Sequence, residues 1–346
     1  TQVTKLRFFI SLIVDQTVDL SRDNFGVRPL PNLETKFVTA DSLIRVERPR
    51  DQGELFEIAE VSSLQRELKQ VRHSLFSAKT PRTKNKYRER DKELREAIAE
   101  ELKENGWASD DAEKLAAWDP YDQNASAPYF DPEWMFGLKH FDIVIGNPPY
   151  IQIQKFPKAQ KDKWVAQNYQ TYAATADIYC LFYERGADLL EEGGHLAYIT
   201  SNKWMRAGYG EKLRKFLSTE VDSHALLDFG MAQNFGAATT YTCITQLTRR
   251  SPSGHLLTCY ATDDKAAMAD PGVYFEAHAV KQRDLSGMPW VVLSPERHAI
   301  KKQVEAQGIP LKEWDIQINY GIKTGFNDAF YLTREQRDIF VAEDPR

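Results

Sequence analysis

The stretch FDIVIGNPPY (residues 141–150) decides the fold class of this chain. Its first half is a short apolar run, which is typical of a strand buried in a parallel sheet. The run ends abruptly at a glycine, an asparagine and two prolines, which are residue types that interrupt regular structure. On its C-terminal side, strand and helix patterns alternate as far as Leu247. This alternation predicts an α/β fold built on a doubly wound, mostly parallel sheet.

Neighbouring segments supply the other elements of that fold. Three further apolar runs predict strands, at residues 195–202, 224–230 and 239–247. A glycine pair at residues 193–194 is expected to end the helix that precedes the first of them. Near the N-terminus, residues 5–14 predict a helix, and residues 36–40 predict a short strand that ends just before Asp41.

Residues 54–105 have a different texture, with long helical patterns. Apolar residues recur there at helical spacing in two runs: Leu64, Leu68, Val71 and Leu75, then Leu94, Ile98 and Leu102. A strongly basic stretch, AKTPRTKNKYRER, separates the runs and breaks the pattern at Pro81. We interpret the segment as an antiparallel helical hairpin inserted into the α/β domain. Its charges are either a solvated helix face or an arm that contacts DNA phosphates or a neighbouring domain.

Composition narrows the class of protein. The 346 residues carry a formal net charge of −5, which argues against a uniformly basic nucleic-acid coat but allows a local basic cleft. The three cysteines form no CxxC pair and have no histidine cluster nearby, so we expect no bound metal and no disulfide framework. A reducing cytoplasm is the expected compartment. No apolar run approaches the roughly 20 residues of a membrane span.

The turn Asn147-Pro148-Pro149-Tyr150 carries the chemistry. In α/β sheets, ligands bind beyond the carboxyl ends of the strands, where this turn is expected. The two prolines stiffen the turn, and Asn147 adds a side-chain carbonyl acceptor. Two acceptors held close together can receive both hydrogens of an exocyclic amino group, while Tyr150 offers a face for stacking. The combination suits an adenine flipped out of a duplex; the alternative is an ordinary strand-to-loop turn.

FDIVIGNPPY resembles the catalytic motif of amino-group methyltransferases that use S-adenosylmethionine, in particular the gamma class of DNA adenine-N6 methyltransferases. The order of KLRFFISLIV, PLPNLETKFVTADSL, a helical insertion and DQNASAPYFDPEWMFG resembles the fused type IIG restriction-modification enzymes, and methyltransferases of phage-exclusion systems are similar. The resemblance covers nearly the whole chain. NPPY also occurs in the glutamine methyltransferases of release factors, so the surrounding context is the more specific part.

The resemblance implies roles for single residues. Asn147 and the carbonyl group of Pro148 would accept hydrogen bonds from the target N6 amino group, and Tyr150 would stack on the flipped adenine. Cofactor contacts are implied for four residues: Asp41, Asn147, Asp177 and Phe182. A polar strand-end or helix-cap role is the alternative for Asp41, and a place in the helix core is the alternative for Phe182 and for the neighbouring Tyr179.

Two later segments also match the resemblance. NFGAATTYT is similar to a motif that supplies a second aromatic wall to the base, for which Phe235 is the first candidate and Tyr241 the competitor. NYGIKTGFNDAFYL is similar to the opening of a target-recognition domain, where Lys323, Thr324 and Asn327 would meet DNA phosphates. GIKTG alone is too short to define a phosphate-binding loop.

The chain departs from the family pattern in one respect, because it has no glycine-rich cofactor loop of the form (D/E)xxxGxG after a strand. The resemblance places that loop and the first strand of the sheet upstream. We therefore expect a fragment of a longer polypeptide that also holds a recognition domain; the type IIG resemblance would place a nuclease further upstream. We expect this fragment alone to bind S-adenosylmethionine weakly and to be inactive.

Four segments follow from these patterns: a first part of the methyltransferase core at 1–53, the hairpin at 54–105, the core with the catalytic loop at 106–250, and a linker with the start of the recognition domain at 251–346. The predicted function is methyl transfer from S-adenosylmethionine to a flipped adenine of double-stranded DNA. The alternatives are a catalytically silent DNA-binding or specificity module and a protein-glutamine N5 methyltransferase.

Overall fold

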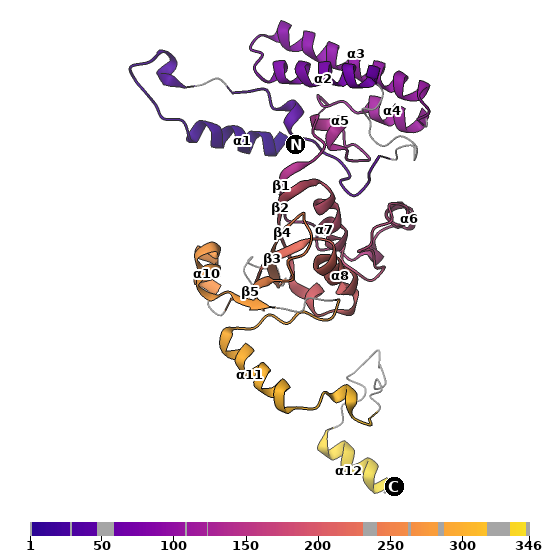
Figure 1. Cartoon of the computed structure of the whole chain (residues 1–346), viewed down its shortest axis with the longest axis vertical. Coiled ribbons are helices and arrows are strands. Elements are labelled where there is room, and N and C mark those ends of the chain that lie inside the picture. Colours follow the sequence, from indigo (N-terminus) through magenta and orange to yellow (C-terminus); the bar gives the residue numbers. More distant parts are fainter. Residues whose placement is uncertain are drawn as a thin grey trace. The chain divides into compact units, whose positions relative to one another are not determined.

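The computed structural model (Figure 1) describes residues 2–27, 30–46, 59–107, 109–122, 124–230, 241–261, 264–282, 287–316 and 333–343. The chain divides into two compact units, Thr1–Pro295 and Glu296–Arg346. The first unit holds the β-sheet and the turn at Asn147. The second unit holds most of α11 (Pro295–Gln307) together with α12 (Arg334–Glu343).

A six-stranded sheet in the order β1-β2-β4-β3-β5-β6 forms the centre of the first unit. Its strands are β1 (Phe141–Gly146), β2 (Leu190–Ser201), β3 (Asp222–Asp228), β4 (Thr242–Thr248), β5 (Leu256–Tyr260) and β6 (Val280–Gln282). The four strands predicted between residues 141 and 247 are all present, and the α/β class is confirmed. The last two strands extend the same sheet beyond Ser251.

The sheet is mixed, so the expectation of a mostly parallel sheet was wrong. Only the pairs β1–β2 and β3–β5 are parallel, and the other three pairs are antiparallel. The reversal occurs at β4: Asp228 pairs with Cys243, and Phe229 N donates to Thr242 O over 3.1 Å. The end of β3 thus meets the start of β4, so the two strands run in opposite directions. An apolar run in the sequence identifies a strand but not its direction.

β1 is less buried than its apolar sequence predicted. Within the described residues it pairs only with β2, which places it at one edge of the sheet. Ile143 is 64 % exposed and Ile145 is 75 % exposed, whereas both side chains would be covered if β1 lay inside a parallel sheet with helices on both faces. The outer edge and one face of β1 are therefore open in the part of the chain that the structure describes.

The glycine pair near residue 193 lies inside β2 instead of ending the preceding helix. That helix, α7 (Tyr179–Asp188), ends earlier, and β2 begins at Leu190. Gly193 has φ +83°, and the pairing of β1 with β2 shifts register across this segment. A Cβ on Gly194 would lie 3.0 Å from the Asp142 carbonyl oxygen. The glycines therefore allow a bulge in which the two backbones approach closely.

The main hydrophobic core lies between the sheet and the helices α7 and α8 (Glu211–Thr219). Its largest fully buried members include Tyr179, Tyr183 and Trp204. Burial of each such side chain contributes roughly 1.5–3 kcal/mol. The Tyr183 ring of α7 meets the Tyr198 ring of β2 edge to face at 5.4 Å and lies tilted against Trp204 at 6.1 Å, so the core fixes α7 relative to β2.

The two long helices predicted for residues 54–105 are present as α2 (Ala59–Phe76) and α3 (Pro81–Glu104). Pro81 begins α3 and does not interrupt it, because a proline is tolerated in the first helical turn. Thr80 caps the helix by accepting a hydrogen bond from Thr83 N. The basic stretch after Pro81 is therefore helical, and the connection between the helices is short.

The hairpin is held to the neighbouring segments by a buried charged cluster. Asp91 is 0 % exposed and accepts hydrogen bonds from Arg72 Nε at 2.7 Å and Arg95 Nε at 2.9 Å. The Arg72 guanidinium also donates to the Trp134 carbonyl oxygen, and that of Arg95 donates to the Trp118 carbonyl oxygen. Trp134 belongs to α5 (Pro132–Phe136), so the cluster ties α2 and α3 to the segment that leads into β1.

The strand predicted for residues 36–40 was wrong. Only Ala40 forms a bridge, a parallel one with Ala127. Immediately after it, Asp41 Oδ1 accepts a hydrogen bond from Leu43 N at 3.2 Å, and Ile44 N donates to the Asp41 carbonyl oxygen. The aspartate side chain therefore turns the chain and takes the donor that a longer ladder would need.

The remaining described helices are α1 (Gln2–Val14), α4 (Ser109–Ala117), α6 (Lys158–Ala166), α9 (Asp264–Ala269) and α10 (Pro271–His278). Short 3-10 turns lie between them: η1 (Asp23–Gly26), η2 (Glu34–Lys36), η3 (Ile153–Lys155), η4 (Asn202–Met205), η5 (Gly208–Gly210) and η6 (Leu311–Glu313). Helix α1 confirms the helix predicted at the N-terminus. Among the described residues, no helix combines the length and the apolar character that a bilayer crossing requires.

Candidate active site at the carboxyl edge of the sheet

The turn Asn147–Tyr150 leaves the carboxyl end of β1, as predicted. Asn147 and Pro149 are exposed, Pro148 is buried, and Tyr150 is half-buried. The Tyr150 hydroxyl donates to Asn147 Oδ1 over 2.8 Å and is 3.2 Å from the Ile199 carbonyl oxygen of β2. The turn is therefore held against β2 by the hydroxyl of its own tyrosine.

This hydroxyl contact was not expected from the sequence, which assigned Tyr150 a stacking role through its ring. Burial raises the pKa of Tyr150 to about 12, so the hydroxyl keeps its proton at neutral pH and acts as a donor. In this state it occupies the acceptor atom of Asn147. The tyrosine ring stands edge-on to that of Tyr179, with 6.0 Å between the centroids.

Asp177 is brought to the same place by a short backbone pairing. Gln152 and Asp177 form an antiparallel bridge, and Ile178 N donates to the Ile151 carbonyl oxygen over 2.8 Å. The segment that follows the NPPY turn thus pairs with the residues just before α7. This pairing joins Asp177 to the segment that follows the NPPY turn. Tyr179, the first residue of α7, contacts the ring of Tyr150.

Tyr209 is a residue of this site that the sequence analysis missed. Its hydroxyl donates to Asp177 Oδ2 at 3.2 Å and lies 2.9 Å from the Tyr179 hydroxyl. Burial raises the pKa of both Tyr179 and Tyr209, so these hydroxyls remain neutral. The one signal in the sequence is the placement of Tyr209 between Gly208 and Gly210, which lets the chain turn tightly there.

Asp41 contacts α6, and Phe182 lies in α7; both helices follow the NPPY turn in the chain. Besides the hydrogen bond within its own turn, the Asp41 carboxylate accepts one from Gln160 Nε2 of α6 at 3.1 Å. Phe182 is partly buried and packs against the core cluster that also contacts Tyr150. Both predicted cofactor roles stay predictions.

The ends of β2 and β3 complete this edge of the sheet. Asn202 Nδ2 donates to Asp228 Oδ1 at 2.7 Å and to the Gly230 carbonyl oxygen at 3.0 Å. Burial raises the pKa of Asp228, while the hydrogen bonds from Asn202 and Gly230 N and the charge of Arg206 oppose that rise. Polar groups that follow β1, β2 and β3 are thus gathered at one carboxyl edge, with the antiparallel β4 between β2 and β3.

Of the two aromatic candidates for the second wall, only Tyr241 lies in the described part of the chain. It is half-buried, and its carbonyl oxygen accepts a hydrogen bond from Asn202 N at 3.0 Å, so it lies at the same edge. Phe235 falls outside the described residues. The DNA-contact candidates Lys323, Thr324 and Asn327 also fall outside them.

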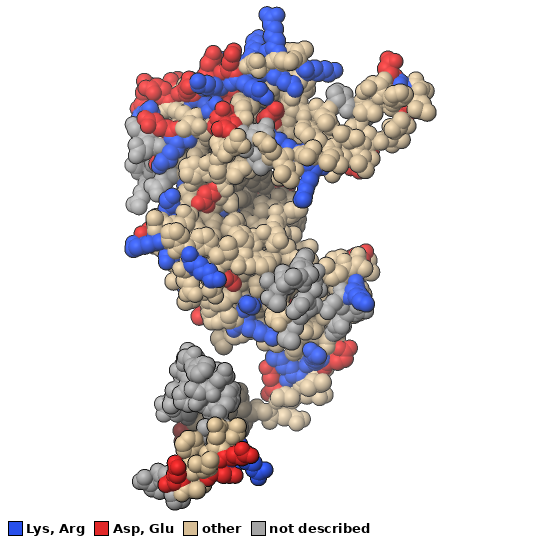
Figure 2. Space-filling model, turned by 180° about the vertical axis from the view of Figure 1, so that it is seen from behind, with Lys and Arg blue, Asp and Glu red and all other residues tan. Residues whose placement is uncertain are grey.

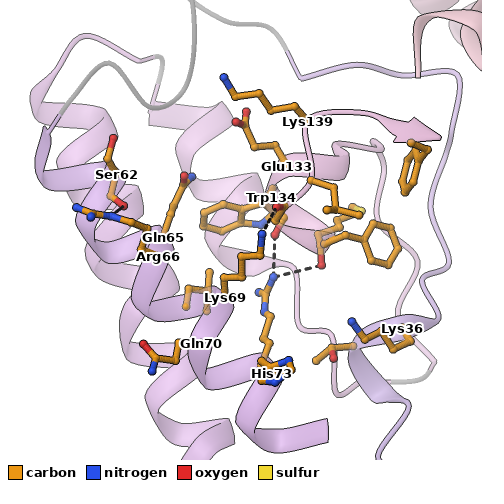
Figure 3. Close-up of a pocket in the computed structure, with 18 residues that line it drawn as sticks. Lys36, Ser62, Gln65, Arg66, Lys69, Gln70, His73, Glu133, Trp134 and Lys139 are labelled. Carbon is orange, nitrogen blue, oxygen red and sulfur yellow. Dashed lines mark hydrogen bonds between the residues drawn. The ribbon is translucent and has the colours of Figure 1, made fainter. Parts of the chain in front are cut away.

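A hollow lies at the start of β1, at the opposite end of the strand from the NPPY turn (Figure 3). It has a volume of about 850 Å³ and is bounded by α2, by α5 and by Phe141, the first residue of β1. The side chains labelled in Figure 3 include Gln65, Lys69, Trp134 and Lys139. Because β1 starts at this hollow and ends at Asn147, the hollow is separate from the carboxyl-edge site.

The surface of the hairpin mixes charges of both signs (top of Figure 2). Arg90 pairs with Glu67 and Glu93, and Lys92 lies 3.8 Å from Glu96. Such exposed pairs contribute roughly 0–1 kcal/mol each, and they occupy cations that a DNA phosphate would otherwise meet. These pairs favour the solvated-face interpretation for the part of the hairpin around Arg90. The exposed Lys79, Arg82 and Lys86 form no ion pair within the described residues, so for their stretch the DNA-arm interpretation stays a prediction.

Metal ligands and cysteines do not contribute to the site within the described residues. No group of three or more His, Cys, Asp or Glu side chains that could hold a metal ion occurs in the part of the chain described. Cys180, Cys243 and Cys259 are buried as free thiols in α7, β4 and β5. The polar chemistry of the edge is therefore that of amides, hydroxyls and carboxylates.

The sheet and the turn define a class of protein: mixed α/β proteins that carry an Asn-Pro-Pro-Tyr turn at the carboxyl end of a strand. Within that class, sequence comparison is decisive, because the family model described as "Eco57I restriction-modification methylase" matches residues 1–235. The chain belongs to the Eco57I restriction-modification methylase family. The matched residues include the hairpin, the NPPY turn, α7 and the ends of β2 and β3.

Curated relatives give the same picture over part of their length. The type II methyltransferase M.XhoI of Xanthomonas vasicola is 30% identical over 213 residues, covering 57% of this chain and 39% of that protein. The type II restriction enzyme and methyltransferase RM.Eco57I of Escherichia coli is 34% identical over 113 residues, covering 32% of this chain and 11% of that protein. The chain therefore spans less than two fifths of these relatives.

Among solved structures, the type IIG restriction endonuclease BpuSI is similar with a TM-score of 0.34 and 13% identity, covering 74% of this chain and 33% of that one. The relatives divide between proteins named as methyltransferases alone and proteins named as both enzymes. The membership in a restriction-modification family is confirmed, while the fused type IIG organisation stays a prediction.

Proposed function

We propose that the protein containing this chain methylates the N6 amino group of an adenine flipped out of double-stranded DNA. The observation that carries the proposal is the exposed Asn147 at the carboxyl edge of the sheet, on a turn stiffened by Pro148 and Pro149, in a restriction-modification methylase family. Because the chain spans 39% of M.XhoI, the activity is proposed for the whole protein.

Asn147 and Pro148 would act on the amino group through two acceptors. Asn147 Oδ1 and the Pro148 carbonyl oxygen each accept one N–H hydrogen, which fixes the nitrogen and turns its lone pair away from the turn. Preorganised acceptors of this kind need no rearrangement when positive charge develops on the nitrogen. No covalent bond to the enzyme is required.

Tyr150 is proposed to release Asn147 when the base binds. Its hydroxyl holds Asn147 Oδ1 at 2.8 Å, which is the atom assigned to the amino group. A base that enters the site would replace this hydroxyl as the donor, and the freed ring would stack on the base at roughly 1–3 kcal/mol. The proposed base wall is completed by Tyr241 or Phe235.

S-adenosylmethionine, as the proposed methyl donor, supplies a methyl group on a positively charged sulfur. The carboxylate and carbonyl oxygens of this edge fit the cofactor, because it presents hydroxyl and amino hydrogens that need acceptors and because it carries positive charge. Asp177 is half-buried and uses one of its carboxylate oxygens for Tyr209, which leaves acceptor capacity on the other. We assign Asp177, Asp41 and Phe182 to cofactor binding, together with the backbone of Asn147.

The proposal that a nuclease accompanies methylation rests only on the resemblance to type IIG enzymes. A fused enzyme would cut DNA that lacks methylation and would spare DNA that it has modified. Lys323, Thr324 and Asn327 are proposed to contact the phosphates of the recognition site. Incubation of the whole protein with unmethylated and premethylated plasmid tests this part separately.

The test of the main proposal is a methyl-transfer assay with the full-length protein. Labelled S-adenosylmethionine and duplex DNA are incubated, and the nucleosides are separated after digestion. We expect the label in N6-methyladenine, and we expect Asn147→Ala to abolish it. Label in N4-methylcytosine would reject the adenine assignment, and label in a glutamine-containing peptide but not in DNA would favour the protein-methyltransferase alternative. DNA binding without transfer would favour the catalytically silent module.

A further inference from the structure

The 3-10 turn η4 carries two cations around two buried apolar residues. In the sequence Lys203-Trp204-Met205-Arg206, Trp204 is 0 % exposed and Met205 is 1 % exposed, whereas the flanking Lys203 and Arg206 are exposed. Ser201 Oγ caps the turn by accepting a hydrogen bond from Lys203 N at 3.4 Å. The apolar pair therefore anchors the turn, and both cations face solvent.

Buried contacts fix this turn to the rest of the molecule. The Arg214 guanidinium donates to the Trp204 carbonyl oxygen at 2.5 Å and to the Ala207 carbonyl oxygen at 2.9 Å. Trp290 N donates to the Met205 carbonyl oxygen at 2.8 Å, and the rings of Trp204 and Trp290 meet edge to face at 5.3 Å. With its carbonyl groups satisfied in this way, the turn is a rigid platform.

The platform lies beside the catalytic turn. It begins at Asn202, directly after β2, and Asn202 is bound to Asp228 at the end of β3. Three residues before Asn202, the Ile199 carbonyl oxygen contacts the hydroxyl of Tyr150. Lys203 and Arg206 are therefore at the same carboxyl edge as Asn147, where the target base is proposed to bind.

Lys203 and Arg206 have no ion-pair partner among the described residues, unlike Arg72, Arg90 and Arg95 of the hairpin. Arg206 is close enough to lower the pKa of Asp228, but that carboxylate is buried and already accepts hydrogen bonds from Asn202 and Gly230 N. A fixed turn with two exposed, unpaired cations is complementary to an anionic polymer.

We infer that Lys203 and Arg206 bind the phosphates that flank the target adenine. This inference rests on the proposed function, since the ligand is the DNA strand from which the base is flipped. A lysine binds a phosphate as a point charge, while the arginine fork can bind two phosphate oxygens at once. Such contacts position the strand and carry no sequence information.

The test measures DNA binding by the full-length protein across a series of salt concentrations. Each phosphate contact contributes about −0.9 to the slope of log affinity against log salt concentration. We expect Lys203→Gln and Arg206→Gln each to reduce the slope by about one and to weaken binding equally on duplexes with and without the target site. Binding of S-adenosylmethionine is expected to stay unchanged. Lys281→Gln, an exposed lysine on the far edge strand β6, is the matched control and should change nothing.

The outcomes separate this inference from the function on which it rests. A wild-type protein that methylates DNA, combined with an unchanged slope in the Lys203→Gln/Arg206→Gln double variant, overturns the inference alone. A loss confined to the duplex with the target site also overturns it, because that pattern indicates a base contact. Failure of the wild-type protein to bind or methylate DNA overturns the proposed function. Because both side chains are exposed, the variants are expected to fold like the wild-type protein. Thermal melting measured in parallel checks this.

Discussion

Two polar clusters of this chain are built on opposite principles. In the hairpin, Asp91 is completely buried and binds Arg72 and Arg95, whose guanidinium groups also donate to backbone carbonyl oxygens. At the carboxyl edge, Asn147 is exposed and its acceptor is held only by a neighbouring tyrosine hydroxyl. The comparison teaches that the charged cluster uses its hydrogen bonds for stability, while the neutral cluster keeps an acceptor that a substrate can take.

The largest effect should come from breaking the charged cluster. Asp91→Ala leaves two arginines buried without their shared carboxylate, and loss of one partner from a buried ion pair costs roughly 3–5 kcal/mol of folding free energy. Thermal or denaturant unfolding of the full-length protein measures this loss. Glu96→Ala is the control on the same helix, because its exposed pair with Lys92 contributes only roughly 0–1 kcal/mol. Equal stability of the two variants would contradict the structural role.

At the other cluster, Asn147→Ala should leave stability nearly unchanged and reduce the methylation rate on the order of a hundredfold or more, since one preorganised acceptor is lost. DNA affinity should stay within a few-fold. Single-turnover methylation and DNA-binding measurements on the same preparation separate these effects. If the rate were unaffected, Asn147 would have no part in the chemistry, and the contrast between the clusters would disappear.

An intermediate effect is expected at Tyr209, where structure and site overlap. Tyr209→Phe removes the donor to Asp177 and deprives the Tyr179 hydroxyl of a partner, at roughly 1–3 kcal/mol for an unsatisfied buried group. We expect a higher KM for S-adenosylmethionine with a smaller change in kcat. The double variant Tyr179→Phe/Tyr209→Phe should recover stability but not the KM. Full recovery of both would mean that Tyr209 serves only to partner Tyr179.

The smallest effect is predicted for Tyr150→Phe. The variant loses the hydroxyl that holds Asn147 but keeps the ring that is proposed to stack, so much of the activity should remain. Tyr150→Ala should instead weaken base extrusion, which a 2-aminopurine probe at the target position reports by its fluorescence. A phenylalanine variant as inactive as the alanine variant would assign the hydroxyl an essential role and would refute the stacking proposal.

Local signals made the centre of the site predictable. Glycine, asparagine and proline act on the chain within a few residues, so the turn at Asn147 and the strand before it were visible in the sequence. Tyr209 was not, because its hydrogen bond to Asp177 joins residues 32 positions apart. Periodicity detects a helix or strand, but it does not show which side chains meet across the fold.

The errors in the fold have equally specific causes. The apolar run of β1 indicated burial, yet burial of Ile145 depends on whether another element packs on the sheet face to which it points. Pattern also missed the competition at Asp41, whose side chain takes the Leu43 N–H group from a possible ladder. Likewise, the glycine pair at residues 193–194 reads equally well as a helix end or as a bulge, and only the pairing with β1 decides between them.

The buried thiols give the chain a built-in reporter of local opening. Burial raises the pKa of Cys243 to about 12 and that of Cys259 to about 11, and it also raises the pKa of Cys180. Alkylating reagents attack the thiolate, so the folded chain should resist them at neutral pH. Because the three thiols lie on α7, β4 and β5, the order in which they become alkylated would map which layer of the sheet region opens first.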